Sequence, residues 1–488
     1  MTTTTLPTPS RTYPSLRAAW IPLSALCLAF FVEMVDNTLL SIALPTIGRD
    51  LGGTTTALQW VTGAYSLTFG GLLLTAGSTA DRLGRRRIFR VGLILFTLGS
   101  LACSLAPSLE WLVAARVVQA LGGCMLNPVA MSIVTNTFTD PKERARAIGV
   151  WGAVFGLSMA CGPVVGGALV SAVGWRAIFW VNIPVGLVAL ALATIFVPES
   201  KAPRARRPDP AGQALVIVAL ASATYAIIEG PRHGWGSGLI IGLFVVAAAA
   251  VGALIAYEGR RREPLLDPRF FRSAPFSGAT VIAVCAFLCL SGFLFLNTLY
   301  LQDERGYSAV HTGLMTLPMA AANVALSPIS GRLVGSVGPR VPLLGAAAAI
   351  LAAALIMTTF TPTTPLLIVV IAYILMGLGF GLVNAPITNT AVSGMPRTQA
   401  GVAAAVASTS RQVGSSLGVA VFGSILASGG SFTHASHICW WVGVGCAVVI
   451  GTLGIITTGR AAKASAVRTA AIFTSADADT RVAVGQAS

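Results

Sequence analysis

Charged side chains are scarce in this sequence. Asp, Glu, Lys and Arg make up 10% of its 488 residues, while 55% of the residues are hydrophobic. Soluble domains carry about 25% charged residues, so a chain this poor in charge could not cover a surface that faces water. The composition therefore indicates a protein embedded in lipid.

Several chemical signatures are missing as well. No GxxxxGK[ST] nucleotide-binding loop occurs, so ATP is not expected to drive the protein within this chain. The four histidines are scattered, no His/Asp/Glu cluster has the spacing of metal ligands, and there is no GxSxG nucleophile motif. The eight cysteines lie in or beside apolar segments without CxxC spacing, which favours small buried hydrophobic residues over disulfides. We therefore expect neither an enzyme, nor a cofactor, nor a metal site.

Positive charge is present but unevenly distributed. The net charge of +15 could point to nucleic acid, yet most Lys and Arg residues fall in alternate short loops and in the two tails. Basic loops stay on the cytoplasmic side of a membrane and can attract anionic lipid, whereas a nucleic-acid surface would gather on one soluble domain. The pattern predicts a multi-pass protein of the plasma (inner) membrane, with both termini cytoplasmic and no nucleic-acid partner.

Fourteen apolar segments are long enough to cross a membrane, which needs about 20 residues per helix. An even number places both basic tails on one side. The segments are 17–45, 55–79, 86–105, 109–136, 145–171, 177–197, 211–229, 238–257, 276–302, 310–334, 341–359, 364–392, 398–427 and 436–458.

A weak internal repeat divides these segments into halves. The turns at 77–87 and 331–340 both follow a glycine-containing helix and both carry basic residues. Such repeats are typical of secondary transporters, whose binding site lies between the halves near the middle of the membrane. The predicted organisation is a disordered cytoplasmic N-terminus (1–16), a six-helix bundle (17–205), a two-helix insert (206–260), a second six-helix bundle (261–458) and a disordered cytoplasmic tail (459–488).

Two carboxylic acids lie inside the first apolar segment. Glu33 and Asp36 are three residues apart and therefore share one side of a helix. A charge at mid-membrane costs roughly 2.5–3.5 kcal/mol on insertion scales, and retained ones usually mark a pathway. The pair could bind one proton and one cationic compound, or two protons. A structural ion pair or a hydrogen-bonded carboxyl near the membrane face is the alternative for each residue.

Two arginines also lie inside apolar segments. Arg116 is followed one turn later by Gln119, and a buried arginine needs a partner, for which a carboxylate of the first segment is the obvious candidate. Separating such a pair would couple protonation to helix movement, whereas a static structural pair is the alternative. For Arg411 and Gln412 we favour packing or gating over substrate contact.

Glycines mark two further motifs. In the fifth segment, glycines permit close helix contact and Pro163 bends the helix. In the loop at 77–87, Gly77 permits helix contact, Gly84 permits a tight turn, and Asp81 can pair with the neighbouring arginines. A plain basic turn that only sets the topology is the alternative for this loop.

These segments resemble motifs of the major facilitator superfamily, specifically its fourteen-helix drug/proton antiporter branch. The resemblance covers about residues 17–458 and implies an all-α integral membrane fold of two six-helix bundles plus a two-helix insert. The loop at 77–87 resembles G-x-x-x-D-R-x-G-R-[RK], and residues 36–45 resemble D-x-T-V-V-N-V-A-L-P, with Ser41 in place of Asn. Residues 116–122 resemble R-x-x-Q-G-x-G, with Ala120 in place of Gly, and residues 162–167 resemble G-P-x-x-G-G. Residues 175–184 resemble the branch's entry into the sixth helix, and a structural role is expected there.

The resemblance implies roles for particular residues. Proton coupling falls to Asp36 and Arg116, and we add Glu33, which the motif does not cover, because it shares one side of the helix with Asp36. A cytoplasmic latch between the halves falls to Gly77, Asp81, Arg82, Gly84, Arg85 and Arg86, and the antiporter motif to Gly156, Gly162, Pro163, Gly166 and Gly167. Candidates for lining an apolar drug cavity are Phe30, Tyr65, Gln119, Tyr300, Met315 and Arg411, each of which could instead face lipid or a neighbouring helix.

The function that the resemblance implies is a proton-coupled antiporter, which exports lipophilic or cationic drugs or antibiotics by alternating access. Its partners would be small-molecule lipophilic substrates, protons and membrane lipids, and we expect a monomer. The alternative is a dedicated exporter of a single metabolite, such as a self-made antibiotic, a siderophore or a lipid. A channel or membrane enzyme is a third class, which the missing catalytic and metal-ligand patterns disfavour.

Overall fold

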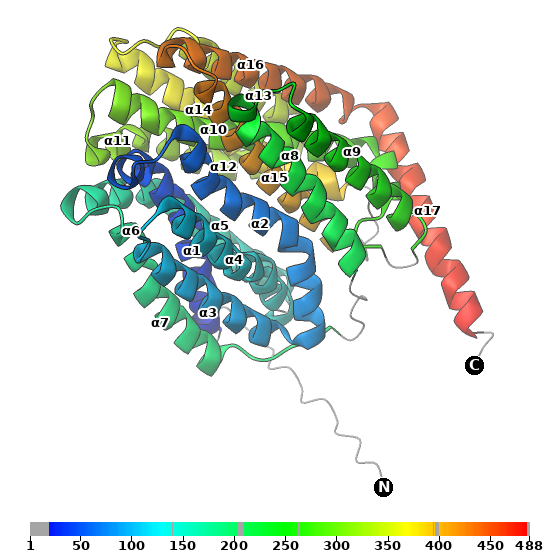
Figure 1. Ribbon diagram of the computed structural model, residues 1–488. Coiled ribbons are helices and arrows are strands. Elements are labelled where there is room, and N and C mark those ends of the chain that lie inside the picture. The colour runs from blue at the N-terminus through cyan, green and yellow to red at the C-terminus, as the bar shows by residue number, and fades with distance from the viewer. Residues whose placement is uncertain are drawn as a thin grey trace.

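The regular structure of the protein is helical throughout the residues that the computed structural model describes, which are 19–138, 140–202, 209–261, 264–393, 395 and 400–485 (Figure 1). The N-terminal segment expected to be disordered, 1–16, lies outside these residues. Helices suit a chain in lipid because each satisfies its own backbone hydrogen bonds.

The chain forms two helical bundles, and the segment that connects them along the chain forms a two-helix insert (Figure 1). The first bundle contains α1 (Trp20–Leu51), α2 (Thr55–Leu83), α3 (Arg85–Ser104), α4 (Leu109–Thr137), α5 (Pro141–Ala172), α6 (Ala177–Trp180) and α7 (Asn182–Phe196). The insert contains α8 (Pro210–His233) and α9 (Gly238–Glu258). The second bundle contains η1 (Pro268–Arg272), α10 (Ala274–Leu299), η2 (Tyr300–Glu304), α11 (Ala309–Met315), α12 (Leu317–Val337), α13 (Arg340–Met357), α14 (Leu366–Val392), α15 (Ala400–Ala427) and α16 (Phe432–Ile456), and is followed by α17 (Arg460–Gly485).

Twelve helical segments of the described chain are long and apolar enough to cross a membrane. The helices α2 and α15 have 29 and 28 residues but are not among the twelve. These two helices pack against each other, so part of each faces protein. A helix in this position needs a less continuous apolar surface than one that faces lipid, which accounts for the more polar sequences of α2 and α15.

The two bundles meet along two seams, α2 with α15 and α5 with α11 and α12. Near the start of α2, the Gln59 amide donates to the backbone oxygens of Val419 (3.3 Å) and Ala420 (2.8 Å). On the other seam, a Cβ atom at Gly167 would overlap the backbone oxygen of Ala309, and one at Gly313 would overlap the backbone oxygen of Pro163. The bundles are therefore in close contact at the end where α1 finishes and α2 begins.

The α5–α12 seam is looser toward its opposite end. A Cβ atom at Gly156 would still lie 3.3 Å from Val324, but positions Gly149 and Gly152 have no atom within 4 Å. Gly152 lies one turn and Gly149 two turns before Gly156, on the same face of α5. On the partner helix, Gly331 also has no neighbour within 4 Å. Along this seam the bundles are thus in close contact at one end, whereas these glycines toward the other end have no close neighbour.

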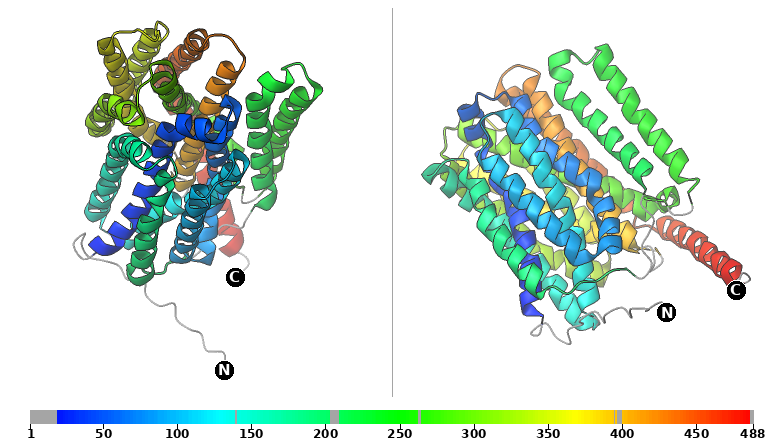
Figure 2. Two further views of the ribbon diagram at one scale, coloured as in Figure 1. Left: turned by 60° about the vertical axis from the view of Figure 1, so that its left-hand side comes forward. Right: turned by 60° about the horizontal axis from the view of Figure 1, so that its bottom comes forward.

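The insert stands to one side of the two bundles (Figure 2). Its first helix packs on both α2 and α15 and so covers the seam between them. Polar contacts fix it to α2: Gln213 donates to the backbone oxygen of Gly71 and accepts from Thr75 Oγ1, and Trp60 Nε1 donates to Glu229 Oε1 at 3.0 Å. Glu229 is therefore a buried contact between the insert and the first bundle.

The C-terminal tail corrects one prediction. We expected 459–488 to be disordered, but residues 460–485 form α17. The segment is rich in alanine, which has the highest helix propensity. The helix is also anchored: Phe473 packs on Phe270 with ring centroids 5.0 Å apart, and Ser465 Oγ accepts a hydrogen bond from the Ala274 backbone at 3.0 Å.

Candidate functional site

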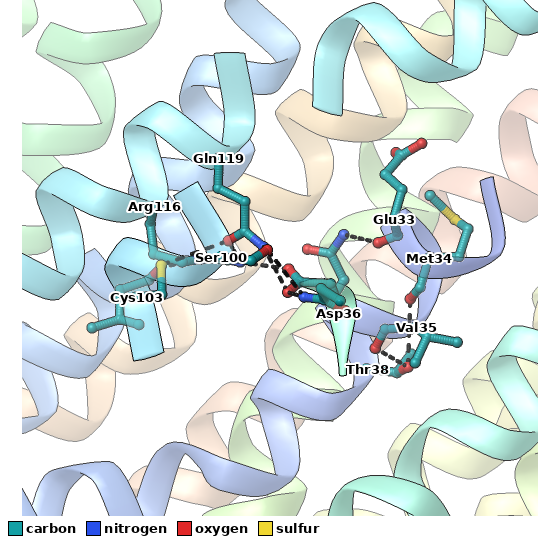
Figure 3. A network of polar contacts seen from close by, with 12 residues as sticks. Glu33, Met34, Val35, Asp36, Thr38, Ser100, Cys103, Arg116 and Gln119 are labelled. Atoms are coloured by element: carbon teal, nitrogen blue, oxygen red, sulfur yellow. Dashed lines mark hydrogen bonds and ion pairs between the residues drawn. The ribbon is translucent and has the colours of Figure 1, made fainter. Parts of the chain in front are cut away.

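Asp36 of α1 is the centre of a buried polar network (Figure 3). Its side chain is 1% exposed, and Arg116 Nη1 of α4 lies 2.5 Å from Oδ2. The second carboxylate oxygen accepts hydrogen bonds from Gln119 Nε2 (2.8 Å) and from Asn182 Nδ2 of α7 (2.6 Å). Asp36 therefore has an opposite charge at one oxygen and two amide donors at the other.

Further side chains hold the partners of Asp36 in position. Ser100 of α3 accepts from Gln119 Nε2 at 2.8 Å, and Arg116 Nη1 donates to Gln119 Oε1 at 2.5 Å. The guanidinium of Arg116 also lies over the ring of Tyr65 in α2, 4.1 Å from its centroid, which is a cation–π distance. The network thus ties together α1, α2, α3, α4 and α7, and movement of any one of these helices would strain it.

The pairing of Arg116 with a carboxylate of the first helix agrees with the sequence interpretation. The contribution of Asn182 to this network was not predicted. Asn182 is 0% exposed, and its position after α6 was expected to be structural. The available signal was a lone amide inside an apolar segment, since a buried amide needs a partner. The distant Asp36 could not be identified as that partner from spacing along the chain.

Glu33 lies one turn before Asp36 but outside this network (Figure 3). Its side chain is 0% exposed, and neither carboxyl oxygen has a hydrogen-bond partner among the described residues. Nearby, Asn37 donates to the backbone oxygen of Glu33, not to its carboxyl group, at 3.1 Å. Burying a carboxylate without a partner is far more costly than burying a neutral carboxyl group. The two acids therefore occupy different environments, one paired and one unpaired.

The glycines of the fifth helix bring α5 against its neighbours. A Cβ atom at Gly162 would overlap Thr38 Oγ1 of α1, and one at Gly166 would lie 3.0 Å from the side chain of Leu39. Gly167 makes the contact with α11 described above. The expected close helix contact is thus present, and it joins α5 both to the helix that carries Asp36 and to the second bundle.

The loop at the end of α2 differs from the expected latch. Arg85 pairs with Asp81 at 2.8 Å, and Gly84 adopts φ 119°, a turn conformation that favours glycine. The described contacts of the loop to other segments lie within the first bundle: Arg86 donates to the backbone oxygen of Val197 at 3.2 Å, and its backbone N–H donates to Glu199 Oε1 at 3.1 Å.

Two consequences follow for the latch residues. A contact of this loop with the second bundle is not seen in this conformation among the described residues, and Glu199, which the sequence did not single out, is its main acidic partner beyond the loop. A Cβ atom at Gly77 would have nothing within 4 Å, so this glycine does not provide the close helix contact expected of it. The latch between halves therefore stays a proposal for another conformation.

Most of the cavity candidates lie in packed regions. Phe30 stacks on Trp151 with ring centroids 4.4 Å apart, and Tyr300 donates through its hydroxyl to the backbone oxygen of Thr361 at 2.7 Å. Tyr65 and Gln119 belong to the Asp36 network, and Met315 is also buried. Tyr300 lines a small cavity between α10 and α16, and Arg411 contacts Thr388, which lines an open recess at the end of α14.

Comparison with known proteins identifies related chains. The family model of the Major Facilitator Superfamily matches residues 26–419. The chain is 39% identical over 422 residues to the multidrug resistance protein Stp of Mycobacterium tuberculosis, covering 86% of this chain and 78% of Stp. It is 35% identical over 410 residues to the tetracenomycin C resistance and export protein of Streptomyces glaucescens, covering 84% and 76% of the two chains.

A solved structure has the same fold. A POT-family transporter crystallised with a thioalcohol-conjugated peptide superposes with a TM-score of 0.67 at 15% sequence identity, covering 90% of this chain and 97% of the other. At this identity the likeness concerns the fold alone.

Proposed function

This chain belongs to the major facilitator superfamily, and on that premise we propose that it exports lipophilic or cationic drugs or antibiotics in exchange for protons. Export of drugs is supported by relatives that are named for multidrug resistance and for antibiotic export. Exchange for protons is supported by the buried acids of α1. The protein would act as a monomer with fourteen spanning helices, α2 and α15 included, and with both termini in the cytoplasm.

Alternating access fits the contacts between the bundles. With cytoplasmic termini, the end where α1 finishes and α2 begins faces outside. The close contacts of Gly167 and Gly313 would then close the outer end, and the looser α5–α12 seam would face the cytoplasm. Rocking of one bundle against the other about a central site would open the outer end in turn.

The observation that carries the proposal is the different surroundings of Asp36 and Glu33. Asp36 is held by Arg116 at 2.5 Å, whereas Glu33 has no partner among the described residues. Glu33 is thus the place where a proton or a cationic compound would neutralise an isolated charge, and the two would compete there. Protonation of Asp36 would remove the charge that holds Arg116, which would release α1 from α4 and couple proton binding to helix movement.

The experiment is a proton-release assay in acid-loaded everted vesicles, with a pH-sensitive dye and a panel of cationic and neutral drugs. We expect drug-induced proton release with the wild type, none with Asp36→Asn, and reduced release with Glu33→Gln at matched expression. The control is Glu110→Gln, which neutralises an exposed carboxylate at the start of α4. Proton release by Asp36→Asn at the wild-type rate would refute the role of Asp36.

A dedicated exporter of one metabolite is the second candidate, and it is favoured by the relative named for a single compound, tetracenomycin C. Resistance profiles separate the two functions. Protection of cells against unrelated dyes and antibiotics supports broad export, whereas protection against one compound class alone supports the dedicated exporter.

A further inference from the structure

Arg411 of α15 is a second arginine inside a membrane helix, and its surroundings differ from those of Arg116. Its Nη2 donates to Thr388 Oγ1 of α14 at 2.5 Å, and its Nη1 donates to Ser408 Oγ at 3.3 Å. Its guanidinium lies 5.9 Å from the ring centroid of Phe287 in α10. Among the described residues Arg411 has no ion pair, and its Nε has no hydrogen-bond partner.

The comparison between the two arginines shows what is unusual. Arg116 is compensated by a carboxylate at 2.5 Å, whereas the described partners of Arg411 are neutral hydroxyl groups. The Arg411 side chain is only partly buried and its contact with Thr388 is exposed, so the guanidinium is accessible while it has no ion pair among the described residues. Charged residues inside membrane helices usually mark a substrate or ion pathway. Such a residue in a membrane helix is therefore a candidate for binding an anion at some stage of the protein's work.

A recess lies directly beside Arg411. It has a volume of about 470 Å³ and is lined by Thr388, Asn389, Val392 and Ser393 at the end of α14. Thr388 both lines the recess and accepts the hydrogen bond of Arg411, so the guanidinium lies at the wall of the recess. The Asn389 side chain is exposed there and its amide offers a further donor to a ligand, whereas the Thr388 hydroxyl already donates to the backbone oxygen of Asn384 at 3.4 Å.

The recess also lies close to the boundary between the bundles. The residue after Arg411, Gln412, packs against Gly70 of α2, where a Cβ atom would lie 2.9 Å from Gln412 Cβ. A group bound at Arg411 would therefore be next to the surface along which the two bundles move.

We propose that Arg411, with Asn389, binds a carboxylate or another anionic group of the transported compounds. The planar guanidinium presents two parallel N–H donors that match a carboxylate, and charge assistance strengthens these bonds. The inference rests on the proposed export function and narrows its substrate class: lipophilic acids and amphoteric compounds are included, in addition to cations. It also assigns Arg411 a ligand contact, where the sequence favoured packing or gating.

The test is a binding assay with a matched pair of fluorescent probes, N-dansylphenylalanine and its uncharged methyl ester. Purified full-length protein is placed in nanodiscs of phosphatidylcholine, and probe affinity is measured for the wild type, Arg411→Gln and Arg411→Lys. The control is Arg332→Gln, which removes an exposed charge from α12. Retained binding of the ester shows that each variant is folded.

We expect the wild type to bind the acid more tightly than the ester, and Arg411→Gln to weaken the acid about tenfold while leaving the ester unchanged. Arg411→Lys should keep part of the preference for the acid, because lysine keeps the positive charge but lacks the two parallel N–H donors of the guanidinium. Equal affinities of the wild type for acid and ester, or equal losses of both in Arg411→Gln, would overturn the proposal.

Two further measurements are needed. One distinguishes a transported compound from a lipid headgroup as the bound anion, and the other distinguishes failure of the proposed function from failure of the anion site. Displacement of the acid by added phosphatidylglycerol, but not by phosphatidylcholine, would assign the site to a lipid headgroup and overturn the assignment to transported compounds. Binding needs no proton gradient, so failure of proton exchange in vesicles would refute the proposed function alone. Intact exchange with no preference for the acid would refute only the anion site.

Discussion

Arg116 Nη1 and Asp36 Oδ2 lie 2.5 Å apart, and their side chains are 0% and 1% exposed. Asp36 belongs to α1 and Arg116 to α4, so a buried ion pair joins two helices of the first bundle. Buried pairs of this kind add little net stability, but breaking one by removing a single partner leaves an uncompensated charge. The pair therefore makes the position of α1 depend on the charge of Asp36.

Replacing Arg116 by Met should destabilise the protein strongly. The change leaves the Asp36 carboxylate buried without a counter-charge, at a cost of about 3–5 kcal/mol. The double variant Arg116→Met with Asp36→Leu should recover much of this loss, because both charges are removed. Thermal unfolding in detergent checks both outcomes, and a double variant no more stable than Arg116→Met would contradict the interpretation.

Replacing Asn182 by Leu should weaken the same network from α7. The substitution removes the 2.6 Å hydrogen bond to Asp36 and the 3.3 Å bond to Ser100, and we expect a loss of about 1–3 kcal/mol in the free energy of unfolding. The matched control is Asn136→Leu, because the Asn136 side chain is exposed and its hydrogen bond among the described residues goes to Ser132 of its own helix. Equal effects of the two substitutions would show that Asn182 has no special connection to Asp36.

The glycines of α5 provide a prediction with an internal control. Gly162→Ala and Gly167→Ala place a Cβ atom against Thr38 and Ala309, so both should lower the yield of folded protein and abolish drug export. Gly149→Ala meets no atom within 4 Å and should be neutral or stabilising by up to about 1 kcal/mol, because alanine favours a helix. Expression and resistance of cells carrying each variant are the measurements. Wild-type export by Gly162→Ala would show that α1 and α5 separate more easily than the structure indicates.

The insert should depend on Trp60 for its attachment. Trp60→Phe removes the 3.0 Å hydrogen bond to Glu229, whose remaining basic neighbours, Arg232 and His233, lie at 3.9 Å. The expected loss is about 1–3 kcal/mol, measured by thermal unfolding. The control is Trp441→Phe, because the Trp441 side chain is 59% exposed. A stability loss confined to Trp60→Phe would support the contact, and an equal loss in both variants would refute it.

Composition and local spacing predicted much of the fold. A chain with 10% charged residues and repeated apolar segments can satisfy its backbone in lipid only as helices. The glycines of α5 also indicated close helix contact, because a residue without a side chain lets any neighbouring helix approach closely. A partner for Arg116 could be inferred in the same way, since a buried charge requires one.

Other features were decided by tertiary packing alone. The spacing of Glu33 and Asp36 places both acids on one side of α1, but the arrangement of α4 and α7 determines that Asp36 receives Arg116 and Asn182 while Glu33 receives neither. Distances along the chain do not encode which helices become neighbours. For the same reason the sequence placed Arg411 inside an apolar segment but did not show that α14 and α15 bring it into contact with Thr388, which lines the recess.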